Sequence, residues 1–436
     1  MRKICVIILA LLVVSGATAQ PLCRTEFAPF DTREDALERD YSRTVNHILY
    51  RPVALGVSGS MEMFGRVVSV PAAWNDYSVY LHVENTIKAY DVAVNGVVVA
   101  STNDPYTPAD YLLSPYLRQG DNEVVLLLRV ASGGELNIGA QCPLREQFEN
   151  CYIYTQYRAG IYDYEAKILH EPSDNTLRLA LDVVARNDFN STEAVSIGYD
   201  IYSPENKLID YGVRTLDVPG RGCDTLRVAV NLGAESRNLW RAGKPSLYRM
   251  TLYVKRGSKP TEYIPFQIGA GQTTFADGRI VRNGTPISIK SARYNARTSY
   301  QEAYRDIQTL KKQGVNTLLP DAPQPAWFYR LCDRLGVYVV ERANINPTKQ
   351  SDNRKVGGTL SNNPQLLDEY LSRVKAMYYR TRNHACIIAY ALGGDLAGNG
   401  YCMYKAYEWL KGVEKSRAVI CTSAEGEWNT DLDKIE

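Results

Sequence analysis

The stretch "RTRNHACIIAYALGGDLAGNG", residues 380–400, decides the fold. It indicates the end of a helix, a short strand from Cys386 to Leu392, and a glycine-rich loop that contains one acid, Asp395. The strand is apolar along its length, which is typical of a parallel strand buried on both faces. The stretch therefore predicts a β-α unit with Asp395 in the loop that follows the strand.

The same unit repeats on both sides of this stretch. After Gly284 the hydrophobic period changes from 2 to 3.6, and helices alternate with short apolar strands. The strand segments are "ISIKSA", "VNTLLP", "VYVVERA", "CIIAYALG" and "AVICTS". Residues 269–436 are thus predicted to form a partial (β/α) TIM-barrel-like segment of about five strands.

The residues before the barrel segment show a period of 2. Segments such as "YSVYLHVEN" and "AYDVAVNGVVVAS" alternate apolar and polar residues, and Asn95-Gly96 is a two-residue hairpin signal. We predict one β-sandwich over residues 20–171 and an immunoglobulin-like β-sandwich over residues 172–268. The expected fold class is multidomain β plus α/β.

The N-terminus has the pattern of an export signal. Arg2 and Lys3 precede an apolar run, and "SGATA" supplies small residues before Gln20, so residues 1–19 are predicted to be a signal peptide. We expect an exported protein, located in the periplasm, at the outer membrane or outside the cell. No later segment is long and apolar enough for a membrane helix, so an integral membrane protein is not expected. Leu22 before Cys23 argues against a lipid anchor.

Composition excludes several classes of partner. The formal net charge is +2 and no long basic run occurs, so no nucleic acid partner is expected. The chain has only four His and no CxxC motif, so neither a metal site nor a cofactor is predicted. Eight of the nine cysteines follow the signal peptide, and Cys142 and Cys151, which flank a short polar loop, are the predicted disulfide.

Four ordered segments of the barrel region resemble glycoside hydrolase family 2, the β-galactosidase and β-glucuronidase family. They are "RNGTPISIKSARYN", "DIQTLKKQGVNTL", "WFYRLCDRLGVYVVERANI" and "RNHACIIAYALGGD". The segment "VNGVVVASTNDPYTPADYLLSPYLRQGDNEVVLLL" is similar to the jelly-roll domain of that family. The resemblance implies a sugar-binding-like jelly roll over residues 20–171, followed by the immunoglobulin-like sandwich and the barrel.

The catalytic positions of the family are altered here. The family's general acid/base is a Glu after Gly-Asn, where this chain has Gly393-Gly394-Asp395, and an Asp withdraws the carboxyl group by one methylene. The family's Asn-Arg-His after the first strand aligns with Arg293, Tyr294 and Asn295. The segment from Pro286 is shorter than the about 250 residues of a whole barrel, so strands 6 to 8 and the family's nucleophile are expected to be absent.

The resemblance places a site at the C-terminal ends of the strands. Asp395 aligns with the acid/base, and the candidate substrate-binding residues are Arg293, Tyr294, Asn344 and Tyr390. Three interpretations of Asp395 remain open: a catalytic acid, a polar residue that contacts a ligand, or an acid that is either solvated in the loop or the N-cap of the next helix.

Two functions are compatible with these patterns. The favoured one is a non-catalytic carbohydrate-binding or protein-interaction role. The alternative is an active β-glycosidase whose barrel is completed by another chain. Because the strands are apolar on both faces, we also expect an exposed apolar interior that a second copy or another exported subunit covers. The 31 tyrosines fit either sugar stacking or cross-strand packing.

Overall fold

The computed structural model describes most of the chain. The described residues are 21–432 except 40–45, 130–135, 138–147, 149, 172, 234–237, 296–298 and 348–354. The predicted signal peptide and Cys142 lie outside them, so the export signal and the predicted disulfide remain predictions. Cys151 is buried and forms no disulfide with a described residue.

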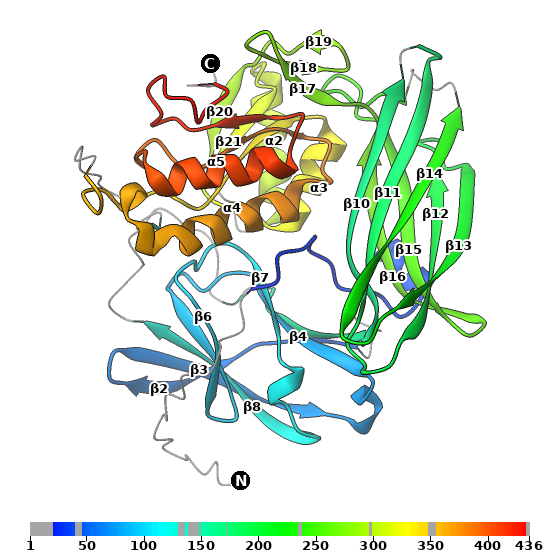
Figure 1. The fold of residues 1–436 in the computed structure, drawn as a ribbon, viewed down its shortest axis with the longest axis vertical. Coiled ribbons are helices and arrows are strands. Elements are labelled where there is room, and N and C mark those ends of the chain that lie inside the picture. The colour runs from blue at the N-terminus through cyan, green and yellow to red at the C-terminus, as the bar shows by residue number, and fades with distance from the viewer. Residues whose placement is uncertain are drawn as a thin grey trace.

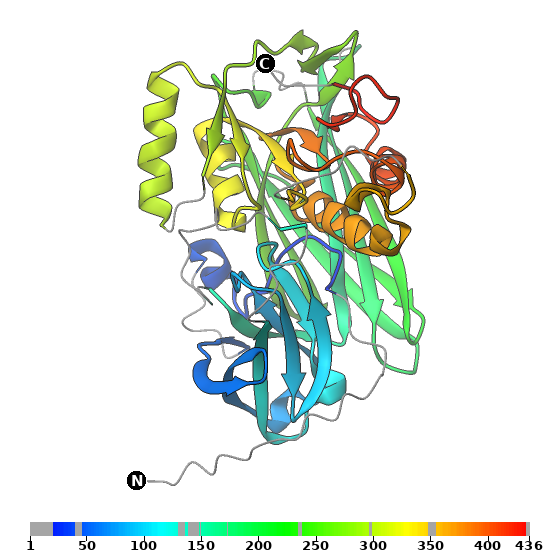
Figure 2. The same cartoon turned by 90° about the vertical axis from the view of Figure 1, so that its left-hand side faces the viewer.

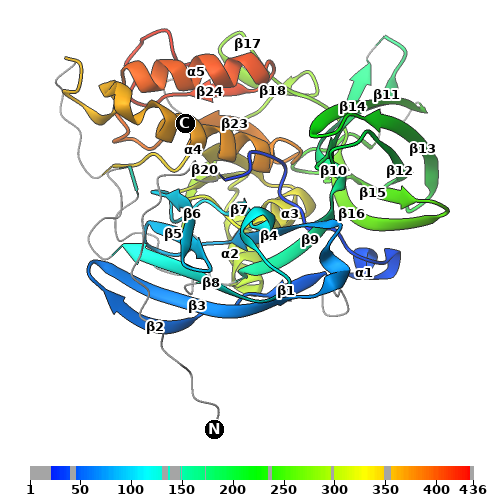
Figure 3. The same cartoon turned by 60° about the horizontal axis from the view of Figure 1, so that its bottom comes forward.

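The first domain is a sandwich of two antiparallel sheets (Figures 1 and 3), as predicted. The sheets have the orders β1-β9-β4-β7 and β2-β3-β8-β5-β6. Their strands are β1 (His47–Leu49), β2 (Val53–Ser58), β3 (Met61–Val70), β4 (Tyr77–Val83), β5 (Tyr90–Val94), β6 (Val97–Thr102), β7 (Ala109–Leu112), β8 (Gly120–Arg129) and β9 (Tyr152–Tyr157). Asn95 and Gly96 both have positive φ, 51° and 82°, and join β5 to β6 in the predicted hairpin.

The second domain is a seven-stranded sandwich in which sheet β10-β11-β14 faces sheet β13-β12-β15-β16. Its strands are β10 (Ala159–Glu171), β11 (Thr176–Asn187), β12 (Glu193–Tyr202), β13 (Leu208–Val218), β14 (Gly222–Gly233), β15 (Leu247–Arg256) and β16 (Lys259–Gly269). The predicted boundary at residue 172 is wrong, because β10 pairs with β11 along its whole length. The second domain therefore begins at Ala159.

The N-terminal segment connects the two sandwiches (Figure 3). Leu22 N donates to Asp110 O of the first sandwich at 3.0 Å, and Phe30 bridges Tyr263 of the second. Helix α1 (Arg33–Glu38) contacts β16.

The third domain contains five parallel strands in chain order, β20-β21-β22-β23-β24, which confirms the predicted partial barrel. Figure 2 shows the helices following one another around the strands, from α2 in yellow-green to α5 in red. The elements are β20 (Ser291–Tyr294), α2 (Tyr300–Lys312), β21 (Thr317–Pro320), α3 (Ala326–Leu335), β22 (Tyr338–Arg342), α4 (Leu367–Thr381), β23 (Ile387–Ala391), α5 (Tyr401–Val413) and β24 (Ala418–Ile420). A small sheet of β17 (Thr273–Ala276), β18 (Arg279–Arg282) and β19 (Thr285–Pro286) precedes them.

Helix boundaries in this domain follow local sequence signals. Ser299 caps α2, since its Oγ accepts a hydrogen bond from Glu302 N at 3.2 Å. Gly336 ends α3 in the left-handed conformation, with φ of 64°. No helix among the described residues has the length and apolar character needed to cross a bilayer.

The interior of the strand layer is not exposed. Every residue of β22, β23 and β24 is buried in the single chain, which makes the predicted exposed apolar face wrong for these strands. The reason is that loops after the strands join the same core, including Ile345, Ala397 and Ala424. Leu432 also bridges Ile420 in a parallel sense and so covers part of the outer edge of β24.

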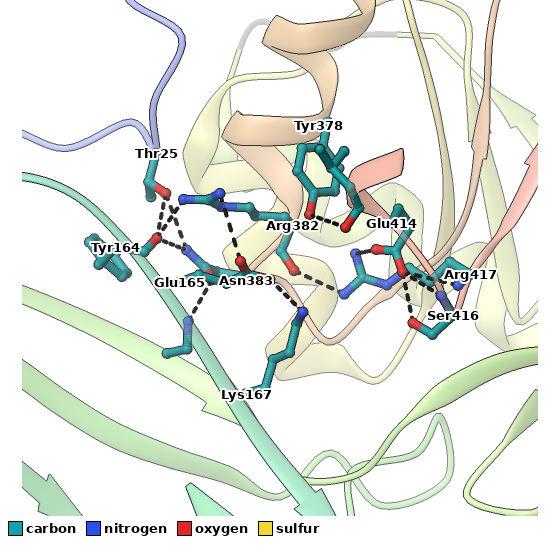
Figure 4. Close-up of polar contacts among 12 residues, drawn as sticks. Thr25, Tyr164, Glu165, Lys167, Tyr378, Arg382, Asn383, Glu414, Ser416 and Arg417 are labelled. Atoms are coloured by element: carbon teal, nitrogen blue, oxygen red, sulfur yellow. Dashed lines mark hydrogen bonds and ion pairs between the residues drawn. The ribbon is translucent and has the colours of Figure 1, made fainter. Parts of the chain in front are cut away.

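A buried polar network joins the third domain to β10 (Figure 4). Arg382 donates to Asp163 at 2.7 Å and to Tyr164 O at 2.9 Å, and the side chains of Arg382 and Asp163 are each only 9% exposed. Asn383 Oδ1 accepts from Ala166 N at 3.0 Å. Arg417 donates to Arg382 O at 2.9 Å, which links β24 to the end of α4. This network fixes the start of β23 and hence the position of the loop that contains Asp395.

Candidate functional site

Four charged side chains meet at the C-terminal edge of the parallel strands. Arg293 lies on β20, Asp321 follows β21, Arg342 ends β22, and Asp395 follows β23. Arg293 Nη1 donates to Asp321 Oδ1 at 3.2 Å, and its Nη2 donates to Asp395 Oδ2 in a short ion pair. Arg342 Nη1 lies 3.8 Å from the same oxygen of Asp321. We call Arg293, Asp321, Arg342 and Asp395 the edge cluster.

The edge cluster is open to solvent on one side. The side chains of Arg293 and Asp395 are 57% and 54% exposed, whereas that of Arg342 is only 10% exposed. The hydrogen bond to Asp395 raises the pKa of Arg293. Burial lowers the pKa of Arg342, as does the nearby charge of Arg293, while Asp321 acts in the opposite direction. The cluster thus combines an exposed ion pair with a buried arginine beneath it.

The glycines before Asp395 are required by close packing. A Cβ on Gly394 would lie 2.4 Å from Asn346 Oδ1, and one on Gly393 would lie 2.6 Å from Ile345 O. The segment after β22 therefore packs directly on this loop and holds the backbone of Asp395. Helix α5 begins at Tyr401 with Gly400 at its N-cap, so Asp395 is not the helix cap.

The structure brings together two of the predicted site residues, Arg293 and Asp395. Asn344 lies elsewhere: its buried amide donates to Asp104 Oδ1 of the first sandwich at 2.6 Å. Asn344 therefore holds two domains together, and its predicted ligand contact is not supported by its position.

The two predicted tyrosines are also buried. Tyr294 stacks on Phe328 of α3 with ring centroids 5.1 Å apart. Tyr390 is completely buried and accepts a hydrogen bond from Arg417 at 2.7 Å. Successive side chains of a strand point to opposite faces, so Tyr294 faces the helices while its neighbour Arg293 faces the other way. The structure thus places both tyrosines in the core, away from the edge cluster.

Asp321 is a site residue that the sequence interpretation missed. It directly follows β21 and binds both arginines of the edge cluster. The sequence could have indicated Asp321, because it is a carboxylate at the C-terminal end of a parallel strand and all such ends meet at one edge of the sheet.

A second group of polar residues lies between the sandwiches. Ligand atoms of Glu26, His82 and Glu84 lie within 4.8 Å of one another, close enough to hold a metal ion. However, His82 Nδ1 lies 2.8 Å from Asp110 and Nε2 lies 3.1 Å from Glu84. Burial alone would lower the pKa of His82, but these hydrogen bonds outweigh it and raise the pKa to about 10. Both ring nitrogens of His82 are therefore paired with carboxylates in this structure.

Comparison with family models identifies two matching regions. Residues 292–436 match the model described as "Glycosyl hydrolases family 2, TIM barrel domain". Residues 160–270 match the model described as "Glycosyl hydrolases family 2". The second match begins near the start of β10, in agreement with the domain boundary seen in the structure.

Similar sequences include bacterial β-galactosidases. The β-galactosidase of Klebsiella pneumoniae is 27% identical over 350 residues, which cover 76% of this chain and 33% of that protein. The β-galactosidase of Priestia megaterium is 23% identical over 401 residues, which cover 87% of this chain and 38% of that protein. The chain therefore matches about a third of the length of these relatives.

Similar solved structures share the fold. A β-glucuronidase from Bacteroides uniformis has a TM-score of 0.69 at 15% identity, covering 85% of this chain and 48% of that chain. A putative β-galactosidase from Bacteroides fragilis has a TM-score of 0.67 at 15% identity, covering 93% of this chain and 56% of that chain. At this identity the likeness establishes the arrangement of domains and leaves the chemistry of the site to its residues.

Proposed function

Because the chain belongs to glycosyl hydrolase family 2, we propose that it is a non-catalytic member of the family that binds carbohydrate at the edge cluster. The observation that supports this proposal is the ion pair between Arg293 and Asp395, the residue aligned with the family's acid/base. The pair leaves the fold of the family intact and holds the carboxylate of Asp395 against an arginine.

Hydrolysis needs two carboxyl groups in different states. One must be protonated to donate to the leaving oxygen, and the other must be ionised to attack or to activate water. In the edge cluster, Arg293 contacts both Asp321 and Asp395, and Arg342 also lies near Asp321. Both carboxylates of the cluster therefore pair with the same arginine, an arrangement that differs from one donor carboxyl group and one free carboxylate.

The same groups suit the binding of sugar hydroxyls. Carboxylate oxygens accept hydrogen bonds from hydroxyl groups, and a guanidinium donates to hydroxyl oxygens. The exposed sides of Arg293 and Asp395 are available to a ligand, while Asp321 holds Arg293 and the glycine-rich loop holds the backbone of Asp395. We expect such a site to bind a saccharide without cleaving it.

We extend the proposal to location and partners. The N-terminal pattern of basic residues, apolar run and small residues supports export to the periplasm, the outer membrane or the medium. Association with a second copy or another exported subunit remains a prediction. The predicted association was based on an exposed apolar face of the strands, and the burial of β22 to β24 removes this argument.

A glycan array followed by calorimetry tests the binding site. The mature protein should bind at least one saccharide, and Arg293→Ala and Asp395→Ala should each weaken that binding about tenfold, because each removes a hydrogen bond that involves a charged group. Arg305→Ala, on the exposed surface of α2, is the matched control and should bind as the wild type does. Unchanged binding in both edge variants would show that the ligand lies elsewhere.

A further inference from the structure

A cavity of about 890 Å³ lies where the three domains meet. It is lined by residues of the N-terminal segment, of the first sandwich, of β16, and of helices α3 and α4. No member of the edge cluster lines it. Figure 1 shows the N-terminal segment, in dark blue, passing between the sandwiches and the helices. Junctions between domains are preferred places for ligand sites, and this volume suits a ligand of several sugar units.

The lining of the cavity has an excess of positive charge. Its acidic residues are Glu26 and Glu84, and its basic residues include His82 and the five arginines Arg39, Arg51, Arg66, Arg330 and Arg380. Three of these arginines, Arg51, Arg66 and Arg330, form no ion pair with any described residue, whereas both glutamates have cationic partners. Unpaired guanidinium groups that face one cavity favour an anionic ligand.

The buried end of the cavity contains a further unsatisfied donor. Arg380 Nε donates to Glu26 at 2.9 Å and Nη2 donates to Gln324 O at 3.0 Å. Its Nη1 has no hydrogen-bond partner among the described residues, although the side chain is only 6% exposed. A buried, charged donor without a partner is costly, and an acceptor atom of a ligand would satisfy it.

Aromatic rings provide the apolar part of the lining. Tyr152 lies between two imidazoles, with ring centroids 4.4 Å from His47 and 4.5 Å from His82. Trp327, at the start of α3, is half-buried and also lines the cavity. Because the faces of Tyr152 are covered by these imidazoles, Trp327 is the ring that can cover the apolar C–H face of a sugar, while the arginines bind charged substituents.

We propose that this cavity is a second binding site, specific for an acidic oligosaccharide whose carboxylate or sulfate groups pair with Arg51, Arg66 and Arg330. The site is separate from the edge cluster, so the inference goes beyond the proposed function and does not depend on it. Arginine presents a planar donor pair that matches carboxylate and sulfate oxygens, which explains why the cavity uses arginines throughout.

Isothermal titration with a sulfated, uronate-containing tetrasaccharide tests the proposal. The wild type should bind this probe and should bind a neutral tetrasaccharide of equal length at least tenfold more weakly. Arg330→Ala and the exposed Arg66→Ala should each weaken binding of the acidic probe about tenfold, since each removes a charge-assisted hydrogen bond. Arg279→Ala, an exposed arginine of β18, changes the net charge equally and should have no effect.

Other outcomes would overturn the proposal. Equal affinities of the wild type, Arg66→Ala and Arg330→Ala for the acidic probe would exclude this cavity. Loss of binding in Arg293→Ala alone would assign the anion to the edge cluster. Equal affinity for inorganic sulfate and for the tetrasaccharide would exclude a saccharide, and so would the absence of binding at millimolar concentration.

Discussion

The stability of this protein should depend on the ionisation of one buried carboxyl group, Glu262 of β16. Its Oε1 accepts a short hydrogen bond from Tyr157 N, at the boundary between the two sandwiches, and its Oε2 has no hydrogen-bond partner among the described residues. Burial raises the pKa of Glu262 from 4.5 to about 7, and the hydrogen bond from Tyr157 and the charge of Arg256 offset only part of this effect.

The sign and size of the effect follow from this pKa. Below pH 4.5 Glu262 is protonated in both the folded and the unfolded chain. As the pH rises to about 7, the unfolded chain releases this proton while the folded chain retains it, so stability falls. Each pKa unit corresponds to about 1.4 kcal/mol, so ionised Glu262 lowers the free energy of unfolding by about 3 kcal/mol above pH 7.

Glu262→Gln removes this titration with little change in shape. Urea unfolding, followed by tryptophan fluorescence at pH 4.5 and pH 8, gives the free energy of unfolding of each protein. The variant should resemble the wild type at pH 4.5 and exceed its stability by about 3 kcal/mol at pH 8. Because other groups titrate in both proteins, the difference between them isolates Glu262. Glu123→Gln, at an exposed carboxylate of β8, is the control and should show no pH-dependent difference. If the free energy of unfolding of Glu262→Gln differed from that of the wild type by the same amount at pH 4.5 and pH 8, the reasoning would be refuted.

Two further changes test how the third domain is held. Arg382→Met leaves a buried carboxylate without its partner and should lower the free energy of unfolding by about 3 kcal/mol, whereas Arg178→Met, in an exposed ion pair, should change it by less than about 1 kcal/mol. Similar midpoints in urea for these two variants would contradict this. Gly336→Ala should lower the melting temperature, because the new Cβ would lie 2.4 Å from Ala242 O. Gly278 has the same left-handed backbone conformation but open space around it, so Gly278→Ala should lower the melting temperature much less. Equal losses in the two glycine variants would show that the close approach does not matter.

Much of the fold could be predicted because its signals are local. Alternation with a period of 2 indicated the sandwiches, and the change to 3.6 indicated the five β-α strands. The boundary between the sandwiches was misplaced because only Arg158 separates β9 from β10, so no loop marks the change of domain. Pairing between β10 and β11 decides this boundary, and pairing is a tertiary property.

The candidate site was only partly predictable. Arg293 and Asp395 were found because Arg293 lies near the C-terminal end of β20 and Asp395 follows β23, and these ends meet at one edge. Tyr294 and Tyr390 were assigned to the same edge although their positions on the strands turn them toward the helices. The cavity between the domains had no sequence signal at all, because its arginines come from segments far apart in the chain.

The interior of the parallel strands shows the limit of arguments from hydrophobicity. Apolar residues on both faces correctly predicted strands that are buried on both sides. They did not reveal that loops of the same chain, with Ile345 and Ala424, supply the cover. The number of strands was therefore a poor guide to the amount of exposed apolar surface.

The turnover of chromogenic β-galactosides and β-glucuronides by the mature chain tests the central claim most directly. We predict no hydrolysis above the rate in buffer for the wild type, because hydrolysis needs two carboxyl groups in different states and both carboxylates of the edge cluster pair with Arg293. Asp395→Asn should give the same result as the wild type. Measurable hydrolysis by the wild type that Asp395→Asn abolishes would contradict the account, since it would show that Asp395 donates a proton despite its ion pair with Arg293.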